Sequence, residues 1–162
     1  DGKREPKAVS RDGRILCFPS ILRVLPSDTV VEIDRKKERR LRPSLIAQEL
    51  KKQQSKRTGI QPEKLIEILY DGYAALVANQ RTRVLRLAAI YDLLTLLPSA
   101  GEYSKQEFAR DLLQLDMSKV RATKNGKRIR FHASTSAKTG AVLTTISPEG
   151  EVKIYSSVEF DE

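Results

Sequence analysis

A stretch of twelve residues with six cations and no acid is the strongest functional signal in the chain. Residues 119–130 read KVRATKNGKRIR, and this stretch contains no Asp or Glu. Cationic side chains grouped in this way are suited to ion pairs with the phosphates of a polyanion, which indicates binding rather than catalysis. The candidate nucleic-acid-binding residues are Lys119, Arg121, Lys124, Lys127, Arg128 and Arg130.

The alternation at the end of this segment predicts a strand, Ile129–Thr135, that displays part of the charge. Successive side chains of a strand point to opposite sides. We expect Ile129, Phe131 and Ala133 on one side, and Arg128, Arg130 and His132 on the other. Aromatic residues are sparse and Phe131 falls on the apolar side, so stacking on single-stranded bases is less expected than contact with a duplex.

A second basic patch lies in residues 34–42, which read DRKKERRLR. Because Asp34 and Glu38 can pair locally with the cations, a solvated charged surface is a stronger alternative here than for residues 119–130. The cations of this secondary patch are Arg35, Lys36, Lys37, Arg39, Arg40 and Arg42. Arg81, Arg83 and Arg86 lie at the start of an expected helix, where the dipole disfavours cations, and this hints at a ligand or an acidic partner.

Residue types that perform catalysis are scarce. His132 is the only histidine and Cys17 the only cysteine, so neither a multi-histidine nor a thiolate metal site can be assembled. The eight glycines are scattered, and none opens a helix in the phosphate-loop pattern. We expect Cys17 to be a small buried residue. We therefore expect no enzyme activity, no catalytic residue, no metal ligand and no cofactor.

Composition is that of a basic globular protein. The 162 residues carry a formal net charge of +9, which favours anionic partners. No apolar stretch approaches the roughly 18 residues that a membrane-spanning helix needs, so we expect no membrane partner and a cytoplasmic or nucleoid location. The chain begins at Asp1 and its only methionine is Met117, and we therefore expect it to be part of a longer protein.

Short apolar runs divided by Pro19 and Pro26 predict strands in the first part of the chain. Residues 1–13 are expected to form an irregular lead-in, and residues 14–58 a small strand-and-helix segment. Residues 34–42 are either a connector or the start of a helix. The expected strands are Arg14–Phe18, Ile21–Leu25 and Thr29–Ile33, and a helix is expected from Pro43 to about Gln54.

The middle of the chain has helical periodicity. Two helices are expected at Pro62–Asn79 and Arg83–Leu97. A third begins after Ser104, because Ser104 and Glu107 have the spacing of a capping box. Tyr103 and Phe108 occupy the two positions of a hydrophobic staple around that box.

After Leu115 the apolar period changes to two residues, which predicts antiparallel strands. The turn signals are Asn125-Gly126, residues 138–140 and residues 147–150. The expected strands are Ile129–Thr135, Val142–Ile146 and Val152–Val158. The predicted fold class is α+β, with a core of three to four helices followed by a three-stranded antiparallel sheet, in a domain that spans residues 59–162.

Helices followed by a basic β-hairpin resemble the winged helix-turn-helix superfamily. The resemblance takes Val84–Leu97 as the first helix, Ser104–Leu115 as the second, and Arg128–Thr145 as the hairpin and wing. It implies a third helix within Ser118–Lys124 that enters the major groove, and a wing that touches the backbone or the minor groove. If that segment is a loop, binding would depend on phosphate contacts and would be weakly sequence-specific.

These observations lead to a non-catalytic duplex DNA-binding domain of a larger protein or complex, which grips phosphates through a basic helix-to-wing segment. The alternative is a protein-interaction adaptor of winged-helix type in an ATPase or chromosome-maintenance assembly. RNA remains open as the polymer, since phosphate contacts do not separate it from DNA.

Overall fold

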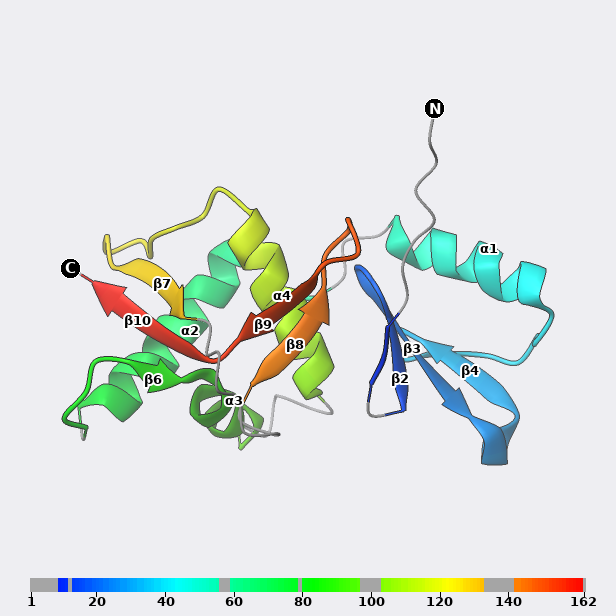
Figure 1. The fold of residues 1–162 in the computed structure, drawn as a ribbon, viewed down its shortest axis with the longest axis horizontal. Helices are drawn as coiled ribbons and strands as arrows, with labels where there is room; N and C mark the ends of the chain where they lie inside the picture. Colours follow the sequence, from blue (N-terminus) through cyan, green and yellow to red (C-terminus); the bar gives the residue numbers. More distant parts are fainter. Residues whose placement is uncertain are drawn as a thin grey trace. The chain divides into compact units, whose positions relative to one another are not determined.

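The computed structural model describes residues 9–11, 13–55, 59–78, 80–96, 103–132 and 142–161 (Figure 1). The chain divides into two compact units. Unit 1 contains the described residues up to Gly59 together with residues 146–152, and unit 2 contains the others from Ile60 onward. The chain combines four α-helices with antiparallel sheets in the described residues, which confirms the α+β class.

Unit 1 is built on a five-stranded antiparallel sheet in which each strand pairs with the next along the chain. Its strands are β1 (Val9–Arg11), β2 (Arg14–Cys17), β3 (Ser20–Leu25), β4 (Val30–Ile33) and β5 (Lys36–Glu38). The strands β2, β3 and β4 confirm the three apolar runs, because their ends agree with the predicted ends to within one residue.

Two segments of unit 1 differ from the sequence prediction. β1 lies inside the expected irregular lead-in, where Val9 pairs with Leu16 across a turn that contains Gly13 at φ +71°. Residues 34–42 do not start a helix, because Asp34 and Arg35 both have positive φ and turn the chain into β5. Such a turn matches the twist of a hairpin. Positive φ angles are unfavourable for residues other than glycine, so the sequence does not predict this turn at Asp34 and Arg35.

The helix α1 (Pro43–Gln54) has the predicted bounds and packs against the sheet of unit 1. Its side chains Ile46 and Leu50 contact a buried cluster of Cys17, Leu22, Val31 and Ile33. A second cluster joins Ile146 to Leu16 and Ile21. This contact explains why residues 146–152 belong to unit 1, whereas the sequence analysis kept them in the domain 59–162.

Unit 2 has a helical core. Its helices are α2 (Pro62–Val77), α3 (Leu87–Thr95) and α4 (Lys105–Met117). Each helix contributes fully buried side chains to this core, for example Leu69 of α2, Ile90 of α3 and Leu112 of α4. At Gly72, a Cβ atom would lie 3.0 Å from Ile90 Cγ2, so glycine allows α2 to approach α3 closely.

The sheet of unit 2 is three-stranded and antiparallel, but it is composed differently from the predicted sheet. Its order is β6 (Leu85–Arg86), β10 (Ser157–Asp161) and β7 (Arg128–His132), while β8 (Leu143–Ile146) and β9 (Val152–Tyr155) pair with each other. The predicted strand Val152–Val158 is therefore split at Ser156, whose N–H donates to the His132 carbonyl. The predicted helix Arg83–Leu97 starts only at Leu87, because the two residues before it pair with β10.

The start of α4 is the best-predicted local feature. Ser104 Oγ accepts from the backbone N–H of Glu107, and the Glu107 carboxylate accepts from the backbone N–H of Ser104 at 2.8 Å. The rings of Tyr103 and Phe108 lie 6.0 Å apart across this box. After Met117 the chain is not helical, so residues 118–124 do not form the third helix that the resemblance implies.

Candidate nucleic-acid interface

The basic segment folds into a small hairpin between α4 and β7, yellow in Figure 1. We call residues 121–129 the basic hairpin. Thr123 N–H donates to the Lys127 carbonyl at 2.9 Å, and Ile129 N–H donates to the Arg121 carbonyl at 3.0 Å. Gly126, at φ +83°, closes the turn with a hydrogen bond to the Thr123 carbonyl, which confirms the predicted Asn125-Gly126 turn.

Two contacts fix the basic hairpin to the helices of unit 2. The backbone N–H of Lys124 donates to Glu67 Oε1 of α2 at 2.7 Å. The Arg121 guanidinium donates to the carbonyls of Leu115 and Asp116, at 3.2 and 2.6 Å, at the end of α4. A cation at this position donates to carbonyls that have no hydrogen-bond partner within the helix, and it interacts favourably with the negative end of the helix dipole.

The structure brings together part of the predicted basic site. The side chains of Lys119, Lys124 and Arg128 are exposed, and none makes an ion pair within the described residues. Lys127 is half-buried, and its backbone N–H donates to Thr123 Oγ1. Arg121 is exposed, but it holds the end of α4. The exposed cations of the hairpin are therefore displayed on a fixed backbone.

The sheet side that was expected to be cationic carries mixed charge, and this corrects the sequence interpretation of β7. Strand β10 lies next to β7, with Glu159 opposite Arg130 and Asp161 opposite Arg128. Arg130 pairs with Asp161, and His132 Nε2 lies 3.4 Å from a Glu159 oxygen. Glu159 and Asp161, which alternate with apolar residues near the end of the sequence, were the sequence signal for this pairing.

Half of the cations in the secondary patch are neutralised by neighbouring acids. Three of its cations have acidic partners: Lys36 with Glu49 at 2.7 Å, Lys37 with Asp28 at 3.2 Å, and Arg40 with Glu38 at 2.8 Å. Hydrogen bonds from Arg40 lower the pKa of Glu38 to about 2. Those from Lys36 and Gln53 lower the pKa of Glu49. Arg35, Arg39 and Arg42 are exposed.

The three arginines expected at the start of a helix mostly precede it. Arg81 and Arg83 lie before β6, so the dipole of α3 does not act on them as predicted. Arg86 is the residue before α3 and lines a pocket of about 550 Å³ with Asp92 and Lys105. The Arg83 carbonyl accepts a hydrogen bond from the Tyr73 hydroxyl at 2.7 Å, which anchors this segment to α2.

A buried polar network anchors α4, and no sequence pattern predicted it. Asp111 is fully buried and accepts from the Tyr103 hydroxyl at 2.7 Å, Arg110 Nε at 3.0 Å and the Ile60 N–H at 3.2 Å. Burial raises the pKa of Asp111, against the opposing effect of Arg110. The network ties the start of α2 to α4, from which the basic hairpin emerges.

Other site chemistry is limited in the described part of the chain. No group of three or more His, Cys, Asp or Glu side chains among these residues could hold a metal ion. Cys17 is buried, and burial raises the pKa of its thiol. None of the described helices has both the length and the apolar character to cross a membrane.

Comparisons with protein-family models, curated proteins and solved structures find no match.

Proposed function

We propose that this protein is a non-catalytic duplex DNA-binding domain of a larger protein or complex, and that it grips phosphates with the basic hairpin and the adjacent Lys119. The observation that carries the proposal is the fixed hairpin with exposed Lys124 and Arg128. A fixed backbone lowers the entropy that these side chains lose on binding. Such a role would place the protein in the cytoplasm or nucleoid, where DNA is found.

The arrangement of unit 2 supports a winged-helix-like fold. Its described residues form three helices and a three-stranded antiparallel sheet, and the basic hairpin lies where the last of these helices meets the sheet. In this arrangement α2, α3 and α4 would be the three helices of the resemblance. The third helix would then be α4, one element earlier than the sequence analysis placed it.

The burial of α4 favours phosphate contacts over base reading. Every residue of Phe108–Leu113 is buried, and Lys105 and Met117 are the exposed residues at the two ends of the helix. A helix that reads bases must present several side chains to the major groove. The proposed binding is therefore weakly specific for sequence and strongly dependent on salt.

A salt-titrated binding assay tests the proposal. The probes are one duplex DNA, the corresponding single strand and a duplex RNA of the same sequence. For duplex DNA we expect log K to fall linearly with log salt, with a slope of about −3 for three to four phosphate contacts. Absence of binding to duplex DNA at low salt would exclude the proposal, and equal binding of duplex RNA would extend it to both polymers.

The second candidate is a protein-interaction adaptor in an ATPase or chromosome-maintenance assembly. The buried third helix favours it, as do the exposed apolar side chains Leu96, Met117 and Ile154, which are 79%, 52% and 42% exposed. Apolar docking predicts a complex that survives moderate salt, because screening weakens phosphate pairs much more than apolar contacts. It also predicts no affinity for any probe in the assay.

A further inference from the structure

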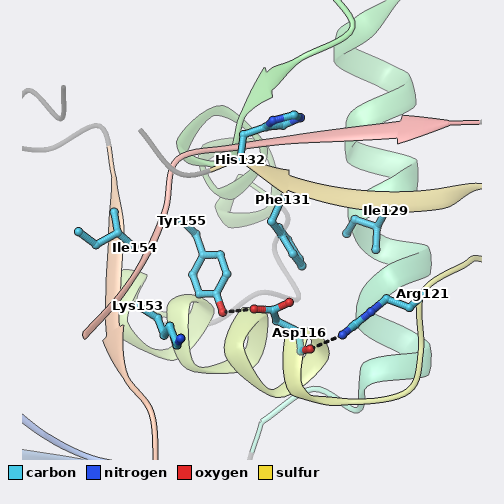
Figure 2. A pocket seen from close by; sticks show the side chains of 8 residues that line it. All are labelled: Asp116, Arg121, Ile129, Phe131, His132, Lys153, Ile154 and Tyr155. Carbon is cyan, nitrogen blue, oxygen red and sulfur yellow. Dashed lines mark hydrogen bonds between the residues drawn. The ribbon is translucent and has the colours of Figure 1, made fainter. Parts of the chain in front are cut away.

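A pocket of about 290 Å³ opens in unit 2 beside the basic hairpin (Figure 2). It lies between the end of α4, β7 and β9. Asp116 comes from α4, Phe131 from β7, and Lys153 and Tyr155 from β9. Arg121 of the basic hairpin borders it. The pocket therefore joins aromatic, acidic and basic side chains next to the proposed phosphate contacts.

Two aromatic rings form one wall of the pocket. Phe131 and Tyr155 meet edge to face, with ring centroids 5.3 Å apart and an angle of 65° between the planes. Phe131 is half-buried rather than fully buried. Figure 2 shows its ring pointing into the space between Asp116 and Tyr155. Phe131 was not expected to stack on bases, because alternation along the strand placed it on the apolar side.

A hydrogen bond holds the acidic group of the pocket in place. The Tyr155 hydroxyl donates to Asp116 Oδ2 at 2.9 Å. Burial and this hydrogen bond to Asp116 raise the pKa of Tyr155, so its hydroxyl keeps the proton that it donates. Asp116 Oδ1 has no hydrogen bond within the described residues and can accept one from a ligand.

Two cations border the same space. The Nη atoms of Arg121 donate to the carbonyls of Leu115 and Asp116 at the end of α4 and to the Val120 carbonyl. These bonds hold the guanidinium at the pocket, while its Nε–H has no acceptor in the described residues. Lys153 lines the pocket from β9. An arginine fixed in this way offers a planar donor that matches a phosphate.

We infer that this pocket binds one unpaired nucleotide of the nucleic acid that the basic hairpin holds. A nucleobase has a flat ring for Phe131 and Tyr155, polar N–H groups for Asp116 Oδ1, and a phosphate for Arg121. The volume of about 290 Å³ lies just below the roughly 300–1,000 Å³ of ligand pockets, which suits one nucleotide and not a longer segment. The inference rests on the proposed function and narrows its target to a duplex with an unpaired base.

The same chemistry could come from a free nucleotide, but the position of the pocket favours a polymer. Arg121 belongs to both the pocket and the basic hairpin, so a base in the pocket would have its neighbouring phosphates close to Lys119 and the hairpin cations. An unpaired base costs less to place in a pocket than one that must first leave its stack.

Binding to two matched duplexes tests the inference. One is a blunt duplex, and the other has the same sequence with a single additional unpaired nucleotide at its centre. We expect about tenfold tighter binding of the second duplex, because stacking of one base on an aromatic side chain has an effect of this size. Adenosine monophosphate, added as a competitor, tests the free nucleotide.

Two variants connect this preference with the pocket. Phe131→Leu removes the ring and keeps an apolar side chain, while Asp116→Asn retains an oxygen for Tyr155 but replaces the free acceptor. Each should remove most of the tenfold preference and leave binding of the blunt duplex unchanged. Tyr70→Leu is the matched control, because Tyr70 is another half-buried ring of unit 2 that does not line the pocket. Thermal melting identifies any variant that fails to fold.

The outcomes separate the two proposals. Equal affinity of the wild-type protein for both duplexes would overturn the inference and leave the proposed function intact. A preference that persists in folded Asp116→Asn and Phe131→Leu proteins would also overturn the inference. The preference would then come from the bend that an unpaired nucleotide introduces into the duplex, and not from the pocket. Binding of adenosine monophosphate without binding of either duplex would overturn both the nucleotide inference in its polymer form and the proposed function.

Discussion

The two basic runs of this protein have similar sequences and different surroundings. In residues 34–42, three cations form ion pairs with Glu49 of α1, Glu38 of β5 and Asp28, which lies in the short 3-10 helix between β3 and β4. In the basic hairpin, the charges of Lys124 and Arg128 have no such partners in the described part of the protein. Three of the six cations in the first run are thus compensated by acids, whereas Lys124 and Arg128 of the hairpin are not compensated by any described acid.

The density of lysine and arginine in the sequence therefore does not tell which cations remain uncompensated in the fold. What matters is whether the fold brings acids to the cations. Arg130 illustrates the point within the basic segment itself, because Asp161 pairs with it from a strand about thirty residues further along the chain. An uncompensated cation keeps its full attraction for a phosphate, whereas a paired one must first lose its partner.

The largest expected effect comes from reversing charge in each run separately. Lys124→Glu with Arg128→Glu should weaken binding of duplex DNA about 100-fold at low salt, since two phosphate contacts become repulsive. Arg39→Glu with Arg42→Glu changes the net charge equally and should weaken binding by less than about threefold, through the overall field alone. Fluorescence anisotropy measures both affinities.

The melting temperatures of both double variants serve as controls. All four side chains are exposed, and such substitutions usually change stability by no more than about 0.5 kcal/mol. If the two double variants lost affinity equally, the basic hairpin would have no special role, and the comparison between the runs would be wrong.

Local signals predicted most of the elements, because they depend on neighbouring residues. The capping box at Ser104 and the bounds of α1 are confirmed since the hydrogen bonds and the proline that define them are local. The pairing of Leu85–Arg86 with β10 could not be predicted, because it joins residues about seventy positions apart and replaces the first turn of an expected helix. Tertiary pairing overrode helix propensity there.

The candidate site was predictable in its charge and not in its geometry. The sequence identified Lys124 and Arg128 because their basic segment contains no acid. It could not show that Arg121 would hold the end of α4, because this contact depends on where the helix stops. The pocket at Phe131 was missed for a similar reason, since its other wall comes from β9.

A moderate gain of affinity should follow when the partner of Arg130 is removed. Asp161→Asn frees Arg130 from its ion pair, and the Arg130 side chain is already 67% exposed. We expect about threefold tighter binding of duplex DNA at low salt and a salt slope steeper by about 0.9, which corresponds to one more phosphate contact. The measurement is the same salt titration as for the wild-type protein.

Asp28→Asn is the matched control in the other run. It frees Lys37 and changes the net charge by the same amount. Because residues 34–42 are not part of the proposed interface, the salt slope of this variant should equal that of the wild-type protein. An equal increase in both variants would show that any released cation is sufficient, in conflict with a localised interface.

The smallest expected effect is on the stability of the compensated run in acid. Glu38 has a folded-state pKa of about 2, below its ordinary value of 4.5, because Arg40 hydrogen-bonds to its ionised form. A lowered pKa means that the pair stabilises the fold fully above the ordinary value, and that this contribution is lost as the pH falls through the folded value. Glu38→Gln should therefore melt at a lower temperature than the wild-type protein at pH 6, and the difference should shrink by pH 2.

Glu32→Gln, on the neighbouring strand β4, leaves the Arg40 pair intact and should keep the wild-type loss of stability between these pH values. A constant difference between Glu38→Gln and wild type at every pH would mean that packing, and not charge, links Glu38 to Arg40, and that the first run is less compensated than its geometry indicates.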